Sequence, residues 1–256
     1  DENVRVGFVP YHYSVNLGAT YHKAAVGTNT ASSSSRNNCV TEREGKNAFT
    51  RVAPVKTQSN TYYETDSALT PYTSGACPTV EIRPLTNDRK ALQRDIDALQ
   101  PSGFTGGHMG IDWGINLLAE EWQDFWHEKS KPADYDDEKV KKILVVMTDG
   151  EFNTAFYDSA INGNSRSRLD RATNQSSVSR DAALQFCDLA KASERNIEVY
   201  TIAFQAGTSA ENLLRSCATP DSDENSQHFF DASSNEELIA AFQNIVAKEL
   251  QVRLIN

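Results

Sequence analysis

The clearest hydrophobic run in the chain covers residues 143–147, where five apolar residues follow two lysines and precede Thr148, Asp149 and Gly150. A short, nearly all-apolar run that ends at a glycine turn is typical of a strand buried on both faces, as in a parallel sheet between two layers of helices. Ligands of such sheets bind at the carboxyl ends of the strands, which is where Asp149 is expected. The alternative is that Asp149 only begins a turn.

Helical and strand patterns alternate from residue 86 onward. Leu92, Ile96 and Leu99 recur at the i, i+4, i+7 spacing of one helix face, in a helix that we expect to begin at Thr86. The other expected elements are a long helix after residue 107, helices at 180–194, 211–217 and 235–250, and strands at 197–204 and 228–230. Further buried positions at helical spacing are Ile111, Ile115, Leu118 and Trp122 in the long helix and Leu238, Phe242 and Ile245 in the last. The alternation predicts an α/β fold class: a doubly wound, mostly parallel sheet with helices on both faces.

The first third of the chain is less regular. Residues 5–9 read as a strand, and residues 13–17 as a short edge strand paired with it. Residues 18–84 are polar and show no periodicity, so we interpret them as an Ω-like insertion. A second polar insertion covers residues 152–179. The chain is therefore expected to be a single domain, 1–256, with two long polar insertions.

Charge and apolar content exclude some classes of protein. The net charge of the 256 residues is −10, which argues against a nucleic-acid partner, because phosphate binding needs a basic surface. The sequence has no stretch of about 18 apolar residues, so no membrane span is expected. Neither of the glycine-rich nucleotide-binding motifs occurs, and a nucleotide cofactor has no support.

The four cysteines predict two disulfide bonds. None forms a CxxC pair, and the five histidines are scattered, so a zinc site is not expected. Cys39 and Cys77 bracket part of the first insertion, whereas Cys187 and Cys217 bracket a strand and its loops. Of three pairings, we predict Cys39–Cys77 and Cys187–Cys217; the alternative is four buried free thiols in a cytosolic protein. If the bonds form, the protein works outside the cytoplasm.

Several segments, taken in order, resemble the von Willebrand factor A domain, and in particular its TadG-like bacterial pilus-assembly type. The matching segments are VRVGFVPYHYSVNLG, the stretch CP…IRPLTND, the Thr-Gly-Gly loop at 105–107, KKILVVMTDGEFN, IEVYTIAF, LLRSCAT and HFFDASSNEELIAAFQNI. They run through nearly the whole chain in the order of the family. The placement of the cysteines is also similar to that group and supports the same disulfide pairing.

The resemblance implies a metal-ion-dependent adhesion site at the top of the sheet. In the family the ion is held by an Asp-x-Ser-x-Ser motif, a loop threonine and an aspartate after the fourth strand; the last two correspond here to Thr105 and Asp149. Hard oxygen ligands with open positions suit Mg²⁺, with Mn²⁺ or Ca²⁺ as alternatives. A carboxylate offered by a protein or cell-surface partner can complete the shell, which makes the site a binding device and not a catalyst.

The Asp-x-Ser-x-Ser motif is absent from this sequence. In the family it follows a first strand that lies mid-sheet, here between residues 5–9 and 143–147. Each buried backbone group left unpaired by a missing strand costs about 1–3 kcal/mol. We therefore expect the missing strand in a preceding segment of the parent protein, which could also anchor it, or in another chain. The alternative is a degenerate domain that closes its sheet differently and binds no metal.

The same topology orients the two insertions. The first, residues 18–84, is expected at the bottom of the sheet, away from the metal. The second, residues 152–179, is expected beside Asp149, and its polar residues are predicted to shape partner choice; these are Asn153, Asp158, Asn162 and Arg166. Asp112 lies about two helical turns beyond Thr105 and is interpreted as structural.

Three functions compete at this point. The first is a non-enzymatic adhesion or assembly module that binds its partner through Mg²⁺ in the periplasm, at the cell surface or in the medium, as part of a pilus or the cell envelope. The second is a structural subunit of the envelope or pilus with a degenerate metal site. The third is a metal-assisted hydrolase that uses Asp149, with His108 as the base; the sequence shows no catalytic triad pattern and no GxSxG motif.

Overall fold

The computed structural model describes residues 4–26, 38–43, 47–56, 62–63, 69–71, 77–101, 103–158, 169, 171–223 and 226–253. The chain divides into two compact units. The first unit comprises Asp1–Val140 and Phe152–Phe186, and the second comprises Lys141–Glu151 and Cys187–Asn256.

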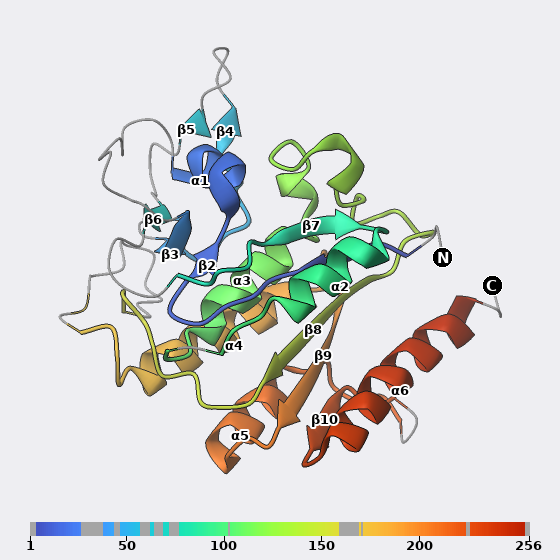
Figure 1. The fold of residues 1–256 in the computed structure, drawn as a ribbon. Helices are drawn as coiled ribbons and strands as arrows, with labels where there is room; N and C mark the ends of the chain where they lie inside the picture. The colour runs from blue at the N-terminus through green and yellow to red at the C-terminus, as the bar shows by residue number, and fades with distance from the viewer. Residues whose placement is uncertain are drawn as a thin grey trace. The chain divides into compact units, whose positions relative to one another are not determined.

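The second unit contains a three-stranded parallel sheet (Figure 1). Its strands are β8 (Lys142–Thr148), β9 (Ile197–Phe204) and β10 (Phe229–Ala232), in the spatial order β10-β9-β8. The register places Val145 beside Tyr200 and Phe230 beside Ile202. These strands are rich in β-branched and aromatic residues, which favour a pleated, buried surface. The α/β class and the three strands are thus confirmed.

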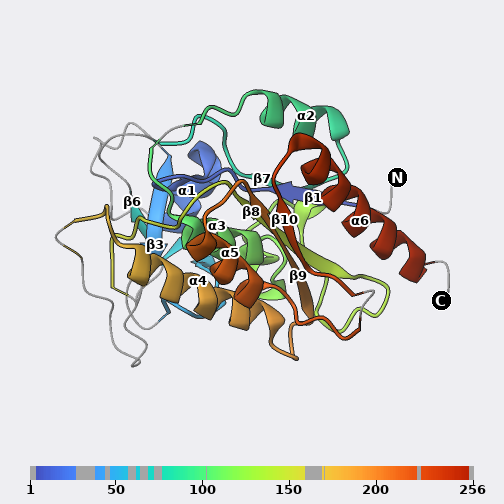
Figure 2. The ribbon, with the colours of Figure 1, turned by 90° about the horizontal axis from the view of Figure 1, so that it is seen from below.

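Helices α5 (Thr208–Cys217) and α6 (Asn235–Arg253) cover opposite faces of this sheet (Figure 2). The Thr201 hydroxyl donates a hydrogen bond to the Leu214 carbonyl of α5, at 2.9 Å. Tyr200 and Ile202 instead pack in one apolar cluster with Ala241 and Ile245 of α6. Because successive strand residues point to opposite faces, the two helices lie on opposite sides. In this unit helices therefore cover both faces of the sheet.

The first unit is built from short strands and short helices. Its strands are β1 (Val6–Phe8), β2 (Val15–Asn16), β3 (Cys39–Arg43), β4 (Val55–Lys56), β5 (Tyr62–Tyr63), β6 (Leu69–Pro71) and β7 (Arg83–Thr86). Its helices are α1 (Gly18–Val26), α2 (Arg89–Asp97), α3 (Gly107–Asn116) and the 3-10 turns η1 (Glu120–Trp122) and η2 (Glu128–Ser130), while α4 (Ser176–Lys191) starts here and ends in the second unit. β1 pairs with β7, and β2 pairs with β3. The expected pairing of residues 13–17 with the first strand is therefore wrong.

Aromatic side chains form the core of the first unit. Trp113 of α3 packs edge-on against Trp122, with ring centroids 5.4 Å apart, and Phe125 and Trp126 complete the cluster. All of α3 is buried. The expected long helix ends at Asn116 and continues as 3-10 turns, and the Asn116 carbonyl accepts a hydrogen bond from the Trp126 indole, at 2.9 Å. The helix is shorter because side-chain packing, and not further helical turns, places these aromatic residues in the core.

The segment 18–84 is more ordered than the polar pattern suggested, since it contains α1 and β3 to β6. It is attached to α3 by a buried ion pair between Arg51 and Asp112, with 2.7 Å between Nη2 and Oδ1. Arg51 also donates to the Asn116 side chain, at 2.6 Å. Asp112, which we interpreted as structural, is thus part of the contact that holds the insertion.

Four residues expected in the core are exposed: Ile96, Leu99, Val145 and Phe242. The prediction that the strand at 143–147 is buried on both faces is therefore wrong, because Val145 on one face is open to solvent. Periodicity identifies the apolar face of an element but not whether this chain supplies a neighbour to cover it.

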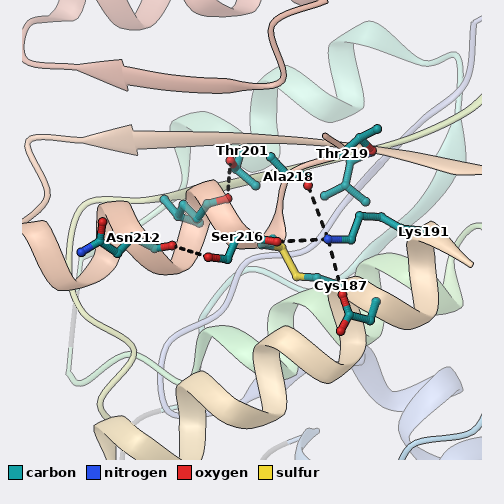
Figure 3. The surroundings of a disulfide bond; sticks show 11 residues. Cys187, Lys191, Thr201, Asn212, Ser216, Ala218 and Thr219 are labelled. Carbon is teal, nitrogen blue, oxygen red and sulfur yellow. Dashed lines mark hydrogen bonds and ion pairs between the residues drawn. A yellow bond between two sulfur atoms is a disulfide. The ribbon is translucent and has the colours of Figure 1, made fainter. Parts of the chain in front are cut away.

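Both predicted disulfides are present. Cys39–Cys77 joins Cα atoms 5.9 Å apart and Cys187–Cys217 joins Cα atoms 5.1 Å apart, both within the usual range. Next to the second disulfide, Lys191 donates hydrogen bonds to the carbonyls of Ser216 and Ala218, at 3.0 and 3.4 Å (Figure 3). These bonds satisfy carbonyls at the end of α5 that have no partner within the helix.

Candidate functional site

The backbone of Thr105 is fixed by the segment that follows Phe152. The Thr105 N–H donates to the Asn153 side-chain oxygen at 2.9 Å, and the Thr105 carbonyl accepts from the N–H groups of Asn153 and Thr154 at 2.9 and 3.2 Å. Three hydrogen bonds thus hold one residue immediately before α3. Within the described part of the chain, the Thr105 hydroxyl itself has no hydrogen-bond partner, and the side chain is half-buried. The loop therefore holds in place a hydroxyl that has no hydrogen-bond partner among the described residues.

Packing around the Thr-Gly-Gly loop leaves little room for side chains at its glycines. A Cβ on Gly107 would lie less than 3.0 Å from the Phe152 ring. Real Cβ atoms essentially never approach so closely. A Cβ on Gly106 would meet the end of the flexible Met109 side chain, which can move, and would lie 3.1 Å from the His12 carbonyl oxygen. In addition, the Gly106 N–H donates to the His12 carbonyl, at 2.6 Å. The loop is therefore constrained on both sides.

His12 links this loop to the disulfide-pinned insertion. Its Nδ1 accepts the Tyr13 N–H at 2.6 Å. Burial lowers the pKa of His12, and a hydrogen bond to the Cys77 backbone opposes this effect without reversing it. Because Nδ1 accepts a backbone N–H, it is the unprotonated nitrogen of the ring. Within the first unit this end of the insertion lies near the Thr105 loop, and its expected place at the bottom of the sheet stays a prediction.

Asp149 follows β8 in the second unit and its side chain is exposed. The turn is stabilised by Thr148, whose hydroxyl accepts the Gly150 N–H at 3.2 Å and donates to the Gly150 carbonyl at 3.0 Å. This arrangement suits both a metal ligand and a simple turn residue. Because Thr105 belongs to the first unit and Asp149 to the second, their shared metal site stays a prediction.

The side chains of Thr105 and Asp149 both offer oxygen donors, which suit a hard cation. Among the described residues there is no group of three or more histidine, cysteine, aspartate or glutamate side chains that could hold a metal ion. A threonine hydroxyl and one carboxylate would need further oxygen ligands from water, from a partner or from residues that the structure does not describe.

The structure places the four residues that we predicted to bind a partner in different environments. The Asn153 side chain is engaged inside the protein, because it accepts hydrogen bonds from the Thr105 N–H and the Thr154 hydroxyl. Asp158 is half-buried. Asn162 and Arg166 lie outside the described residues. Asn153 thus positions the Thr105 loop, and partner recognition by this segment stays a prediction.

His108 lies in a buried cluster that the sequence did not reveal. Its Nδ1 is 2.8 Å from the Ser179 hydroxyl and its Nε2 is 2.9 Å from a Glu42 carboxylate oxygen. Glu42 also accepts the Phe156 N–H, at 2.8 Å. The residue types are those of a hydrolase triad, but the His108 side chain is fully buried and Ser179 is equally inaccessible. A nucleophile must reach its substrate, so the cluster acts here as a structural bridge between β3, α3 and α4.

A second buried network lies in the second unit, around Glu198. Its carboxylate accepts hydrogen bonds from Lys141, from His228 at 2.6 Å and from the Tyr200 hydroxyl at 2.8 Å. Burial alone would raise the pKa of Glu198, but these donors outweigh burial and lower it to about 2. Glu249 of α6 accepts from Tyr200 at 2.5 Å and pairs with Lys141 at 2.7 Å.

This Glu198 network fixes α6 on the sheet rather than forming an open site. Burial and the two carboxylates raise the pKa of Tyr200, which stays protonated as a donor. The ring nitrogens of His228 face Glu198 and Asp221, at 2.6 and 2.9 Å. Sequence reasoning missed this network because it joins distant parts of the chain: Glu198 is 30 residues from His228, and Tyr200 is 49 residues from Glu249.

Four apolar side chains of the second unit are exposed: Val145 on β8 and Ile239, Phe242 and Val246 on α6.

Comparison of the chain with models of known protein families, and with curated proteins, found no match. In the described part of the chain, no helix has the length and apolar character that crossing a membrane requires.

Proposed function

We propose that the protein is a non-enzymatic module that binds a protein or cell-surface partner outside the cytoplasm, in adhesion or in the assembly of a pilus or cell envelope, through a Mg²⁺-dependent site. The observation that carries the proposal is the Thr105 loop. Three hydrogen bonds of the Thr105 backbone, and the close packing of Gly107 against Phe152, hold a hydroxyl that makes no hydrogen bond within the described residues. The two disulfides support an oxidising compartment.

In this proposal Thr105 and Asp149 are the metal ligands. A hydroxyl and a carboxylate are hard donors, which favour Mg²⁺, with Mn²⁺ or Ca²⁺ as alternatives. When bound, the ion would offer an open coordination position to a carboxylate of the partner. Asn153 and His12 would keep the Thr105 loop in place, since their hydrogen bonds set its backbone.

Calorimetric titration with Mg²⁺ and with Mn²⁺ tests the metal site. Binding should be abolished by Asp149→Ala and weakened by Thr105→Ala. Asp136→Ala, which removes another exposed carboxylate, is the matched control and should bind normally. Binding that survives Asp149→Ala would contradict the proposal.

The absent Asp-x-Ser-x-Ser motif favours a second candidate, a structural subunit of the envelope or pilus whose metal site is degenerate. Under that candidate the protein does not bind Mg²⁺ in the same titration. The hydrolase is disfavoured by the burial of His108, whose ring nitrogens are both engaged.

A further inference from the structure

Helix α1 begins next to the Cys39–Cys77 disulfide. Asn16 of β2 is the register partner of Cys39, and the Asn16 side chain donates to the Pro78 carbonyl at 2.8 Å, beside the second half-cystine. The chain then turns at Gly18, where φ is +67°, and α1 packs against β3 (Figure 1). The contact between α1 and β3 thus forms where the disulfide joins the two ends of the insertion, within the first unit.

The His22 imidazole of α1 is buried in this contact with one nitrogen unpaired. His22 is 9% exposed, and within the described part of the chain its Nε2 has no hydrogen-bond partner. The ring hydrogen-bonds to the backbone of Cys39. Protonation would give the ring a charge and a second N–H donor, and the proton on Nε2 would have no acceptor. A buried charge and an unsatisfied donor both disfavour the protonated form in this contact.

Among the described residues, the side chains around His22 supply no compensating charge. The titratable residues on α1 and on the elements that border it are Tyr21, Lys23, Glu42, Arg43, Tyr62, Tyr63, Glu81 and His127. The carboxylate of Glu42 is bound to His108, at 2.9 Å. Burial therefore dominates and lowers the pKa of His22, while the hydrogen bond to Cys39 opposes this effect without reversing it.

We propose that His22 is an acid-sensitive switch, in which protonation of the imidazole opens the contact between α1 and β3. The closed contact has no acceptor for the added proton, whereas water satisfies the proton once the helix has moved away. The Cys39–Cys77 disulfide limits the change, because it keeps β3 joined to residue 77 when α1 is released. Opening is therefore local and reversible, and the second unit does not take part in it.

The direction of the pH dependence follows from proton linkage. The pKa of His22 in the closed state lies below the ordinary value of 6.5, so the open state binds the proton more readily. Opening is therefore insensitive to pH above about 7.5 and becomes more favourable as the pH falls below the ordinary value. Since one proton is taken up, the open population rises by at most about tenfold for each pH unit.

His12 is a second histidine at the same disulfide. It hydrogen-bonds to the Cys77 backbone, and burial lowers its pKa as well. Its Nδ1 accepts the Tyr13 N–H, in the segment before β2. Substitution of His22 alone therefore separates the two histidines.

Hydrogen–deuterium exchange of the full chain, read by mass spectrometry, tests the switch. The inference goes beyond the proposed function, and a chelator is present throughout because neither Thr105 nor Asp149 takes part. Protection factors are measured at pH 7.5, 6.5 and 5.5, each corrected for the intrinsic exchange rate at that pH. Between the highest and the lowest pH, the protection of the α1 amides should fall by about three- to tenfold, and that of the α6 amides should stay constant.

His22→Phe and His22→Gln should each remove the pH dependence of α1, because neither new side chain takes up a proton. The first keeps an aromatic ring at the site and the second keeps a polar group, and protection of α1 at pH 7.5 verifies that the helix is formed. His127→Gln is the matched control, because His127 is exposed and also contacts α1 through Tyr21, with ring centroids 5.5 Å apart. The control should show the same fall in protection as the wild type.

Three results would overturn the inference. They are an α1 protection that does not change between pH 7.5 and 5.5, a fall that persists in both His22 variants, and an equal fall in α1 and α6. The second result would assign the effect to another group, such as His12, and the third would show global unfolding. Loss of metal binding in the Asp149 variant changes none of these measurements, so the two proposals fail separately.

Discussion

Gly107 stands where the Thr105 loop enters α3, facing the ring of Phe152. Gly107→Ala should lower the stability of the protein by about 1–3 kcal/mol, because the added methyl group must displace a buried aromatic ring. The change is measured as a lower midpoint of thermal unfolding. Gly150→Ala is the control, because a Cβ there has no heavy atom within 4 Å, and it should leave the midpoint nearly unchanged. Equal midpoints for the two variants would show that the loop is not packed as described.

Glu198 makes the stability of the second unit depend on pH. Its pKa, about 2, lies below the ordinary value of 4.5, so the folded state favours the carboxylate. The resulting stabilisation is complete above about pH 4.5 and is lost as the pH falls through 2. Glu198→Gln should reduce stability at pH 7 by about 1–3 kcal/mol and remove part of the decline between pH 4.5 and 2.

Urea unfolding at pH 7, 4 and 2.5 measures both effects. Glu194→Gln is a suitable control, since this glutamate is largely exposed. An unchanged slope of stability against pH in Glu198→Gln would mean that the network does not control acid unfolding.

At the scale of elements, a buried ion pair is one of the contacts that hold the insertion on α3. Asp112→Ala removes the partner of the buried Arg51 guanidinium and should destabilise the protein by about 3–5 kcal/mol. The double variant Arg51→Met with Asp112→Leu should recover much of this loss, because no charge is left buried. Asp95→Ala breaks the half-exposed pair with Arg83 and should cost about 1 kcal/mol or less. Denaturant titrations of the three variants measure these losses of stability. The largest loss in Asp95→Ala would contradict the role assigned to the buried ion pair.

The elements themselves were largely predictable after residue 86, because local patterns define them. The strand at 197–204 and the helices near 211–217 and 235–250 appear close to their expected bounds, with ends shifted by a few residues. The pairing of β2 with β3 was not predictable, because β3 lies in the polar segment 18–84, whose sequence shows no pattern that identifies a strand. The exposure of Ile96 and Val145 was missed for another reason. An apolar pattern identifies the apolar face of an element, but burial also requires a neighbouring element that covers this face.

The candidate site was predictable only where a motif is local. The Thr-Gly-Gly loop and Asp149 belong to continuous motifs, and the sequence alone drew attention to them. The partners that hold the loop, Asn153 and His12, come from distant segments. The same holds for the cluster of Glu42, His108 and Ser179, whose members are separated by 66 and 71 residues.

At the scale of the whole molecule, the chain forms two compact units, and the sequence suggested one domain. Each unit has its own disulfide, its own apolar cluster and its own buried polar network. The proposed metal site requires Thr105 from one unit and Asp149 from the other. Metal binding should therefore couple the units, and this coupling is the central claim of the proposed function.

Paramagnetic broadening by Mn²⁺ tests this claim most directly. In the amide spectrum of the ¹⁵N-labelled protein, a substoichiometric amount of Mn²⁺ should broaden the signals of Gly106 and of Gly150 together. Excess Mg²⁺ should restore both, and Asp149→Ala should abolish both effects. Broadening of only one of the two signals, or of neither, would contradict a shared site.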